Sequence, residues 1–259
     1  MNPPKSNPDA AEAAVAAIIC TAGASARMGG TKKEYRLLSG ATAASGSLTV
    51  LGAAVSAFAA VAAVKAIVIA VPADPATGEA AARNALPPSL LAGKGGPAIH
   101  FVPGGATRRA SVFNALSFIA AQGLPVNIAL IHDGARPWVS PALIQRVIDE
   151  VAIRRAVIPV LPLTETPKET DSPLNAQGGP VLIKRHLKRA VIGAAQTPQG
   201  FAFPEILAAH QQAAAQDDSQ HETFTDDAEV WAEFCGPVAA IPGEPENRKI
   251  TFPEDLDLC

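Results

Sequence analysis

The chain has few cysteines, and their spacing excludes several kinds of site. Cys20, Cys235 and Cys259 are the only three in 259 residues. They form neither a Cys-x-x-Cys pair nor a Cys/His cluster of the kind that binds zinc. Cys20 lies in an apolar run and is expected to be a core residue rather than a nucleophile. Such sparse use of cysteine is typical of a reducing compartment, so we expect a cytoplasmic protein.

The sequence also lacks a basic excess and a long apolar run. Its net charge is −3, so no overall positive field points to nucleic acid, and any anion site must be local. No run approaches the roughly 18 apolar residues of a membrane span. Residues 1–12 lack the basic start and apolar core of a secretory signal, and we expect a disordered leader there.

What the chain does have is a large apolar fraction, 48%, arranged in alternating strand and helix patterns. Apolar runs predict strands at 15–20, 66–71, 98–102, 126–131 and 156–161. Helical patterns are expected at 48–58, 112–119, 141–154, 204–214 and 226–235. This alternation predicts an α/β fold, with a mostly parallel twisted sheet covered by helices on both faces. Because no repeat or linker is present, we expect a single domain over 1–259.

The alternation breaks between residues 162 and 192. Short strands are expected at 181–183 and 190–192, close to four basic residues: Lys184, Arg185, Lys188 and Arg189. We interpret this segment as a protruding β-arm that pairs with another subunit. After it, closing strands are expected at 238–241 and 248–251, and a terminal helix from Pro253.

Chemistry-bearing residues follow the predicted strands. In an open α/β sheet, ligands bind outside the carboxyl ends of the strands. The loop of small residues after Cys20 carries Arg27, Lys32 and Lys33, and its backbone N–H groups are suited to phosphate. An ordinary strand-to-helix turn with solvated basic residues explains that loop equally well. Gly104 and Gly105, followed by Ser111, offer a second place where a ligand reaches the backbone.

Asp133 directly follows the apolar run 128–131. A carboxylate at a strand end, facing a phosphate loop, is well placed to hold Mg²⁺. The alternatives are that Asp133 caps the next helix or pairs with Arg136. His132, beside it, is expected to orient or pack rather than to catalyse.

Taken together, these residues resemble the 2-C-methyl-D-erythritol 4-phosphate cytidylyltransferases of non-mevalonate isoprenoid biosynthesis. The resemblance runs from about Val15 to Leu256 and rests on the order of many short motifs. These are Thr-Ala-Gly at 21–23, Arg-Met at 27–28, Lys-Glu-Tyr at 33–35, Gly-Gly at 104–105 with Arg108 and Ser111, His-Asp-Gly-Ala-Arg-Pro at 132–137, Glu-Thr at 165–166, Thr-Pro-Gln at 197–199, Thr-Asp-Asp at 225–227, and Lys-Ile-Thr at 249–251 before Pro-Glu-Asp at 253–255.

The resemblance implies a Rossmann-like nucleotidyltransferase that uses CTP and a polyol phosphate, releases pyrophosphate and works as a homodimer through the β-arm. Each implied role is carried by residues of this chain. Arg27, Lys33 and Lys249 would be catalytic and face the phosphates; Ala22, Gly23, Gly105, Arg108 and Ser111 would bind the nucleotide; Thr166, Arg136 and the partner arm's copy of Arg189 would bind the methylerythritol phosphate; and Asp133 would hold Mg²⁺.

The chain departs from the family pattern at several positions. The departures are Thr21 and Gly134 (usually alanine), Ser25 (glycine), Ala26 (arginine), Lys32 (proline), Glu34 (glutamine), and Ala106 and Glu165 (aspartate), and the first loop is one residue shorter. Ala26 removes a cation, and the Glu165 carboxylate reaches about one methylene further. We expect the reaction type to survive these changes better than the identity of the acceptor, and we expect Lys32 to be a solvated neighbour of Lys33.

A phosphate acceptor needs no general base, because its second pKa near 6 leaves it largely dianionic at neutral pH. Catalysis then consists of positioning and charge stabilisation. Two alternatives stay open: a cytidylyltransferase acting on ribitol 5-phosphate, and a regulator that binds CTP without turnover. An NAD-dependent oxidoreductase is disfavoured because the glycine fingerprint and the acidic residue after the second strand are missing.

Overall fold

The structure is a computed structural model that describes residues 12–23, 32–38, 48–74, 76–93, 95–174, 179–216 and 224–257. The expected leader except Glu12, the predicted catalytic Arg27 and the departures at Ser25 and Ala26 lie outside the described residues. No helix in the described part of the chain is long and apolar enough to cross a membrane.

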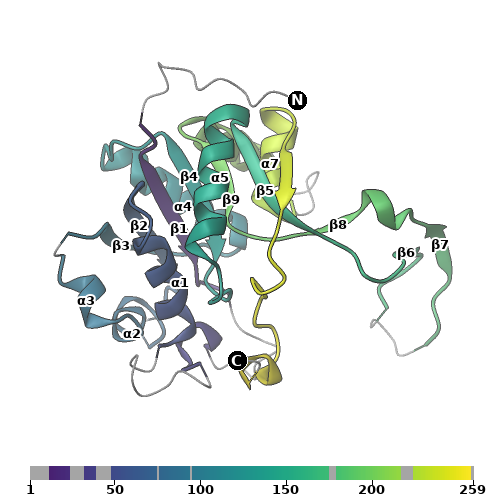
Figure 1. Cartoon of the computed structure of the whole chain (residues 1–259), viewed down its shortest axis with the longest axis horizontal. Helices are drawn as coiled ribbons and strands as arrows, with labels where there is room; N and C mark the ends of the chain where they lie inside the picture. Colours follow the sequence, from purple (N-terminus) through teal and green to yellow (C-terminus); the bar gives the residue numbers. More distant parts are fainter. Residues whose placement is uncertain are drawn as a thin grey trace.

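A mixed, mostly parallel sheet forms the centre of the molecule (Figure 1). Its path runs β10-β5-β9-β4-β1-β2-β3, and β8 pairs with β5. The strands are β1 (Val15–Cys20), β2 (Val64–Val71), β3 (Ala98–Pro103), β4 (Ile128–Asp133), β5 (Ala156–Pro162), β8 (Gly193–Ala195), β9 (Gln199–Ala202) and β10 (Ala239–Pro242). β8 and β9 are antiparallel to their neighbours.

Helices cover both faces of this sheet. They are α1 (Val50–Ala59), α2 (Glu79–Asn84), α3 (Pro88–Leu91), α4 (Arg108–Ala121), α5 (Pro141–Arg154), α6 (Glu205–Ala215) and α7 (Asp227–Phe234). One core packs α1 and α5 against the sheet, and the other packs α4, α6 and α7 against the opposite face. Side chains of Thr49, Thr107, Ser140 and Asp226 cap helix N-termini, as expected for these residue types.

The segment after β5 extends away from the main sheet (Figure 1). It contains a two-stranded antiparallel ribbon, β6 (Lys168–Thr170) and β7 (Ile183–His186), and returns through the 3₁₀ helix η3 (Arg189–Val191) and β8. Two strand predictions are therefore wrong in detail. Residues 181–182 precede β7, and 190–192 belong mainly to the 3₁₀ turn, because the chain must bend there before β8 can pair with β5.

Two further differences concern the end of the fold. β9 was not predicted, because Gln199–Ala202 carries no apolar run; Gly200 fits there since a Cβ atom would lie 2.5 Å from Cγ1 of Val147 on α5. The strand expected at 248–251 is absent from the described structure, which shows irregular backbone there and then the 3₁₀ helix η4 (Pro253–Asp257). Irregular backbone suits a segment whose bonds go to neighbouring loops rather than to a strand, as the N–H of Ile250 does to the carbonyl of Ala135 at 2.9 Å.

Candidate active site

The carboxyl ends of β1 and β4 place the predicted site residues at one edge of the sheet. Cys20, the last residue of β1, is in register with Asp133, the last residue of β4. Burial raises the pKa of the Cys20 thiol to about 12, so the thiol stays protonated and inert at neutral pH. Cys20 packs, partly buried, against the core on one face of the sheet, as expected for a small core residue.

Three cations surround the carboxylate of Asp133. Nζ of Lys249 lies 2.9 Å from one oxygen, and Nε of Arg136 lies 3.6 Å from the same oxygen. Nε of Arg108 lies 3.4 Å from the other oxygen. Burial favours the neutral acid, but these three cations together hold the pKa of Asp133 well below its usual range. Of the two alternatives to a metal role, the pairing with Arg136 is present, whereas the helix cap of α5 is Ser140 and not Asp133.

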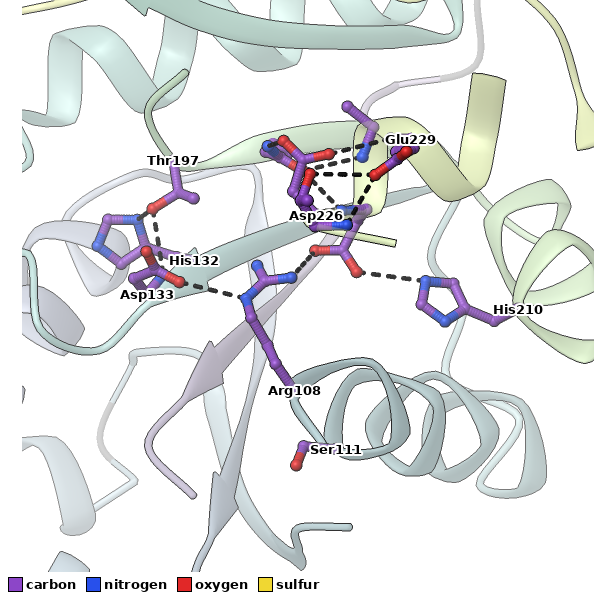
Figure 2. A network of polar contacts seen from close by, with 12 residues as sticks. Arg108, Ser111, His132, Asp133, Thr197, His210, Asp226 and Glu229 are labelled. Carbon is purple, nitrogen blue, oxygen red and sulfur yellow. Dashed lines mark hydrogen bonds and ion pairs between the residues drawn. The ribbon is translucent and has the colours of Figure 1, made fainter. Parts of the chain in front are cut away.

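Arg108 bridges the site to a buried acid behind it (Figure 2). Its Nη1 donates to Oδ2 of Asp227 at 2.7 Å, and Oδ1 of Asp227 lies 3.3 Å from Nε2 of the buried His210. Although burial opposes the charge on Arg108, Asp227 and Asp133 raise its pKa above the usual range. The guanidinium is thus held between two carboxylates with about a third of its side chain exposed.

Small residues of two loops meet beside these charges. A Cβ atom on Gly104 would lie 2.3 Å from Cβ of Ala22, so only glycine allows the loops after β1 and β3 to approach this closely. The buried Ser111 hydroxyl accepts from the N–H of Gly105 at 3.0 Å and donates to the carbonyl of Thr107 at 2.9 Å. Ser111 therefore fixes the glycine turn in this structure.

Lys32 and Lys33 are both buried, whereas the sequence predicts a solvated Lys32. Lys33 is buried, and its Nζ donates to the carbonyl of Ile250 at 2.7 Å, which places it next to the segment that carries Lys249. Lys32 is also buried, which corrects the expectation of a solvated side chain. Its Nζ donates to the carbonyl of Gly23 and lies 3.4 Å from Oε2 of the buried Glu34. Burial lowers the pKa of Lys32, while Glu34 counteracts this effect.

His132 and Thr197 organise the backbone of the turn after β4 (Figure 2). Nε2 of His132 lies 3.1 Å from the carbonyl of Arg136, and because a carbonyl only accepts, this nitrogen carries the proton. Nδ1 lies 2.9 Å from the hydroxyl of Thr197, which also accepts from the N–H of Asp133 at 3.1 Å. Burial lowers the pKa of His132 to about 4, so its ring is neutral at pH 7 and orients its neighbours, as expected.

The residues expected to bind the acceptor fall into two groups. Arg136 lies in the cluster around Asp133, and its Nη1 donates to the carbonyl of Asn247 at 2.8 Å. Thr166 and Arg189 are exposed residues of the arm segment, and Nη1 of Arg189 donates to the carbonyl of Thr164 at 2.6 Å. Among the described residues of a single chain, no contact joins Arg136 to Thr166 or Arg189.

Toward a metal ion at this edge, the cluster described above offers one carboxylate, that of Asp133. In the part of the chain that the structure describes, no three His, Cys, Asp or Glu side chains form a metal cluster. Mg²⁺ in nucleotide enzymes is usually held by one or two carboxylates, with phosphates and water completing its shell. Asp133 is an ionised carboxylate of this kind, and a bound triphosphate would supply the remaining oxygens and engage the cations that now contact Asp133.

Several residues of the site were not singled out from the sequence. Asp227 and Gln199 form its rear wall: the side-chain oxygen Oε1 of Gln199 accepts from the N–H groups of Asp227 and Ala228, both at 3.1 Å. Asn247, fully buried, donates from Nδ2 to the carbonyl of Thr197 at 2.7 Å. The Thr-Pro-Gln and Thr-Asp-Asp motifs were the available signal, but a motif marks a resemblance and does not show which residues are structural partners.

Comparison with known proteins agrees with this arrangement. A family model described as 2-C-methyl-D-erythritol 4-phosphate cytidylyltransferase matches residues 15–259. The bifunctional enzyme IspD/IspF of Bradyrhizobium sp. (strain ORS 278) is 37% identical over 245 residues, which cover 93% of this chain and 54% of that protein. The bifunctional enzyme IspD/IspF of Nitrobacter hamburgensis is 44% identical over 154 residues, 59% of this chain and 35% of that protein. The chain thus spans about a third to a half of the length of these relatives.

Solved structures show the same fold. The 2-C-methyl-D-erythritol 4-phosphate cytidylyltransferase of Thermus thermophilus superposes with a TM-score of 0.64 at 29% identity, covering 95% of this chain and 96% of that one. The 4-diphosphocytidyl-2C-methyl-D-erythritol synthase of Anaerococcus prevotii has a TM-score of 0.73 at 23% identity, covering 95% and 94%. The second likeness supports the fold alone.

Proposed function

The chain belongs to the 2-C-methyl-D-erythritol 4-phosphate cytidylyltransferase family, and we propose that it transfers the cytidylyl group of CTP to 2-C-methyl-D-erythritol 4-phosphate and releases pyrophosphate. The observation that carries the proposal is the cluster at the end of β4. There an ionised Asp133 lies among Lys249, Arg108 and Arg136, beside a closely packed loop of small residues. Concentrated positive charge at a sheet edge suits a triphosphate.

The nucleotide half of the proposed site consists of Ala22, Gly23, Gly105, Arg108 and Ser111. The glycines let the loops after β1 and β3 pack closely, and the backbone groups of these small residues would contact the base and the phosphates. Ser111 would act by holding the N–H of Gly105, so that the turn keeps its shape when cytosine binds. Arg108 would turn toward the phosphates while Asp227 keeps it anchored.

The reaction joins two anions, and the proposed catalytic groups offset their repulsion. The acceptor phosphate attacks the α-phosphate of CTP, and the bond to the β-phosphate breaks with pyrophosphate leaving in line. Lys33 and Lys249, with Arg27 from the first loop, would stabilise the negative charge that develops on the oxygens of the α-phosphate. Mg²⁺ bound by Asp133 and the triphosphate would supply further charge neutralisation. Because the acceptor is already dianionic, none of these residues needs to remove a proton.

The arm is proposed to join two copies of the chain. Its exposed apolar side chains are Leu174, Leu182, Ile183 and Val191, which are 52–80% exposed in the single chain. Apolar groups gathered on a projecting ribbon suit an interface. Because Thr166 and Arg189 have no contact with the cluster around Asp133 among the described interactions, the acceptor site would be completed when the Arg189 of one copy reaches the Asp133 edge of the other.

The test is an acceptor screen with CTP and Mg²⁺ that follows pyrophosphate release and identifies the product by mass. We expect turnover with 2-C-methyl-D-erythritol 4-phosphate and much less with ribitol 5-phosphate. Preference for ribitol 5-phosphate would overturn the acceptor assignment and leave the reaction type. Binding of CTP without pyrophosphate release from any polyol phosphate would instead identify a regulator and overturn the proposal.

A further inference from the structure

The segment that carries Lys249 is held by hydrogen bonds to side chains and loops and not by a sheet. The side chain of Asn247 donates to the carbonyl of Thr197, and Ile250 bonds Lys33 and Ala135. Residues 247–250 form no strand, so they lack the regular ladder that fixes the other parts of the site. The segment begins with a turn in which the N–H of Asn247 donates to the carbonyl of Glu244 at 3.0 Å. Gln196, 3% exposed, lies against this turn at the point where β8 ends.

The amide of Gln196 bonds three backbone groups of the turn. Its Oε1 accepts from the N–H of Glu244 at 3.0 Å, and its Nε2 donates to the carbonyls of Glu244 at 2.8 Å and Asn247 at 3.1 Å. The backbone partners define which end of the amide is oxygen, because an N–H can only donate and a carbonyl can only accept. A Cβ atom on Gly243 would lie 2.5 Å from Oε1, so the preceding glycine leaves room for this contact.

The 244–247 turn positions two cations of the site, Arg136 and Lys249. The carbonyl of Asn247 accepts from Nη1 of Arg136 at 2.8 Å as well as from Gln196. Two residues further on, Nζ of Lys249 lies 2.9 Å from Asp133. Displacing the turn would therefore move Arg136 and Lys249 together, while the glycine turn at Gly105 would keep its bond to Ser111.

We propose that Gln196 is a positioning residue for the transfer reaction, which holds the 244–247 turn so that Lys249 and Arg136 face the carboxylate of Asp133. The inference rests on the proposed function. Gln196 touches none of these three side chains through its own amide, so it acts through the backbone of the turn. Because it directly follows β8, it also joins the base of the arm to the charged cluster.

The experiment compares Gln196→Met and Gln196→Glu with the wild-type chain, using CTP, 2-C-methyl-D-erythritol 4-phosphate and Mg²⁺. Methionine keeps the length of the side chain and removes its hydrogen bonds. We expect kcat to fall about 10²-fold, the size of effect that a misplacement near 1 Å produces, with the KM for CTP changed less than about threefold. Gln145→Met, at an exposed glutamine of α5, is the matched control and should keep wild-type kinetics.

Gln196→Glu gives a readout that loss of stability alone would not produce. Its carboxylate would repel the two carbonyls at neutral pH, whereas the protonated acid donates one hydrogen bond to them. The ratio of variant to wild-type kcat should therefore rise as the pH is lowered from 8 to 5. This ratio remains measurable if Gln196→Met does not fold.

The outcomes separate the two proposals. Wild-type kcat in folded Gln196→Met, or a flat ratio for Gln196→Glu across the pH range, overturns the positioning role and leaves the proposed function intact. Absence of pyrophosphate release by the wild-type chain with every polyol phosphate removes the proposed function, and the inference with it.

Discussion

A Cβ atom on Gly134 would lie 2.8 Å from Cγ2 of Thr21 and 3.0 Å from the carbonyl oxygen of Cys20. Thr21 is fully buried, and its hydroxyl donates to the carbonyl of Ala70 at 2.8 Å, so its methyl group has a defined direction. The family that the sequence resembles is expected to carry alanine at both positions. The larger residue at 21 therefore occupies space that the smaller residue at 134 leaves, beside Asp133.

Gly134→Ala should destabilise this chain by about 1–3 kcal/mol, the usual cost of overpacking a core. In a Thr21→Ala background the same change should cost less, because the methyl group that it meets is gone. Urea unfolding of the four proteins of this double-mutant cycle measures the coupling. Equal costs of Gly134→Ala in both backgrounds would show that the two departures are independent.

Lys33→Ala should lower kcat by about 10²–10³-fold, or about 2.7–4 kcal/mol, by analogy with removal of one oxyanion donor. The variant also loses the hydrogen bond to the carbonyl of Ile250, so kinetics must be measured where circular dichroism shows a folded protein. Lys65→Ala, at an exposed lysine of β2, controls for loss of a surface charge. A near-wild-type kcat for folded Lys33→Ala would remove Lys33 from the catalytic set.

Asp227→Asn should make the protein less stable at pH 7 and less sensitive to acid. Burial opposes ionisation of Asp227, but Arg108 and His210 outweigh it and lower its pKa. The stabilisation is therefore present above the unfolded pKa of about 3.9 and is lost as the pH falls through the lower folded value. We expect a loss of about 1–3 kcal/mol at pH 7, as for a buried group left without its partner.

Urea unfolding between pH 7 and pH 3 checks this prediction. The free energy of unfolding of the wild-type chain should fall more steeply below about pH 4 than that of Asp227→Asn. Asp149→Asn, on the exposed side of α5, controls for the loss of one negative charge. Parallel acid slopes for wild type and Asp227→Asn would show that this carboxylate does not contribute to acid unfolding.

Metal binding should depend on the nucleotide. Asp133 offers one carboxylate, and Lys249, Arg108 and Arg136 compete with a cation for it until phosphate engages them. Calorimetric titration should therefore show weak Mg²⁺ binding to the chain alone and stronger binding with CTP present, and EDTA should abolish turnover. Tight Mg²⁺ binding without CTP that survives Asp133→Asn would place the metal elsewhere.

A negative charge introduced at an apolar residue of the arm should break the proposed dimer. Val191→Asp replaces a side chain that is 80% exposed in the single chain, and burying its carboxylate in an apolar interface is costly. Sedimentation should show a shift from dimer to monomer, with a matching loss of turnover. Ile153→Asp, at a residue of α5 that is 61% exposed and lies outside the arm, is the control. Loss of the dimer in both variants would argue against the arm.

Local pattern was enough to locate much of this fold and one part of its site. The helix predicted at 141–154 is α5, because an apolar stripe and a proline in its first turn are properties of the segment itself. Asp133 ends a buried strand, and the rule that ligands bind at strand ends brought it together with the small residues at 21–23 and 104–105. The strand at 199–202 has no such local signal, because Gly200 is selected by its contact with α5.

Direction and partners of side chains were decided only by tertiary structure. From the sequence alone, Lys32 and Lys33 are adjacent cations, and nothing local says that one donates to Gly23 and the other to Ile250, 217 residues away. The same holds for Gln196, whose partners lie 48 to 51 residues further along the chain. The amino-acid sequence by itself determined most of the helices and strands and the chemical groups at the sheet edge, because these depend on short-range periodicity and strand order. Packing decided which groups hold the cluster around Asp133 in place, because such contacts join segments that only folding brings within hydrogen-bonding distance.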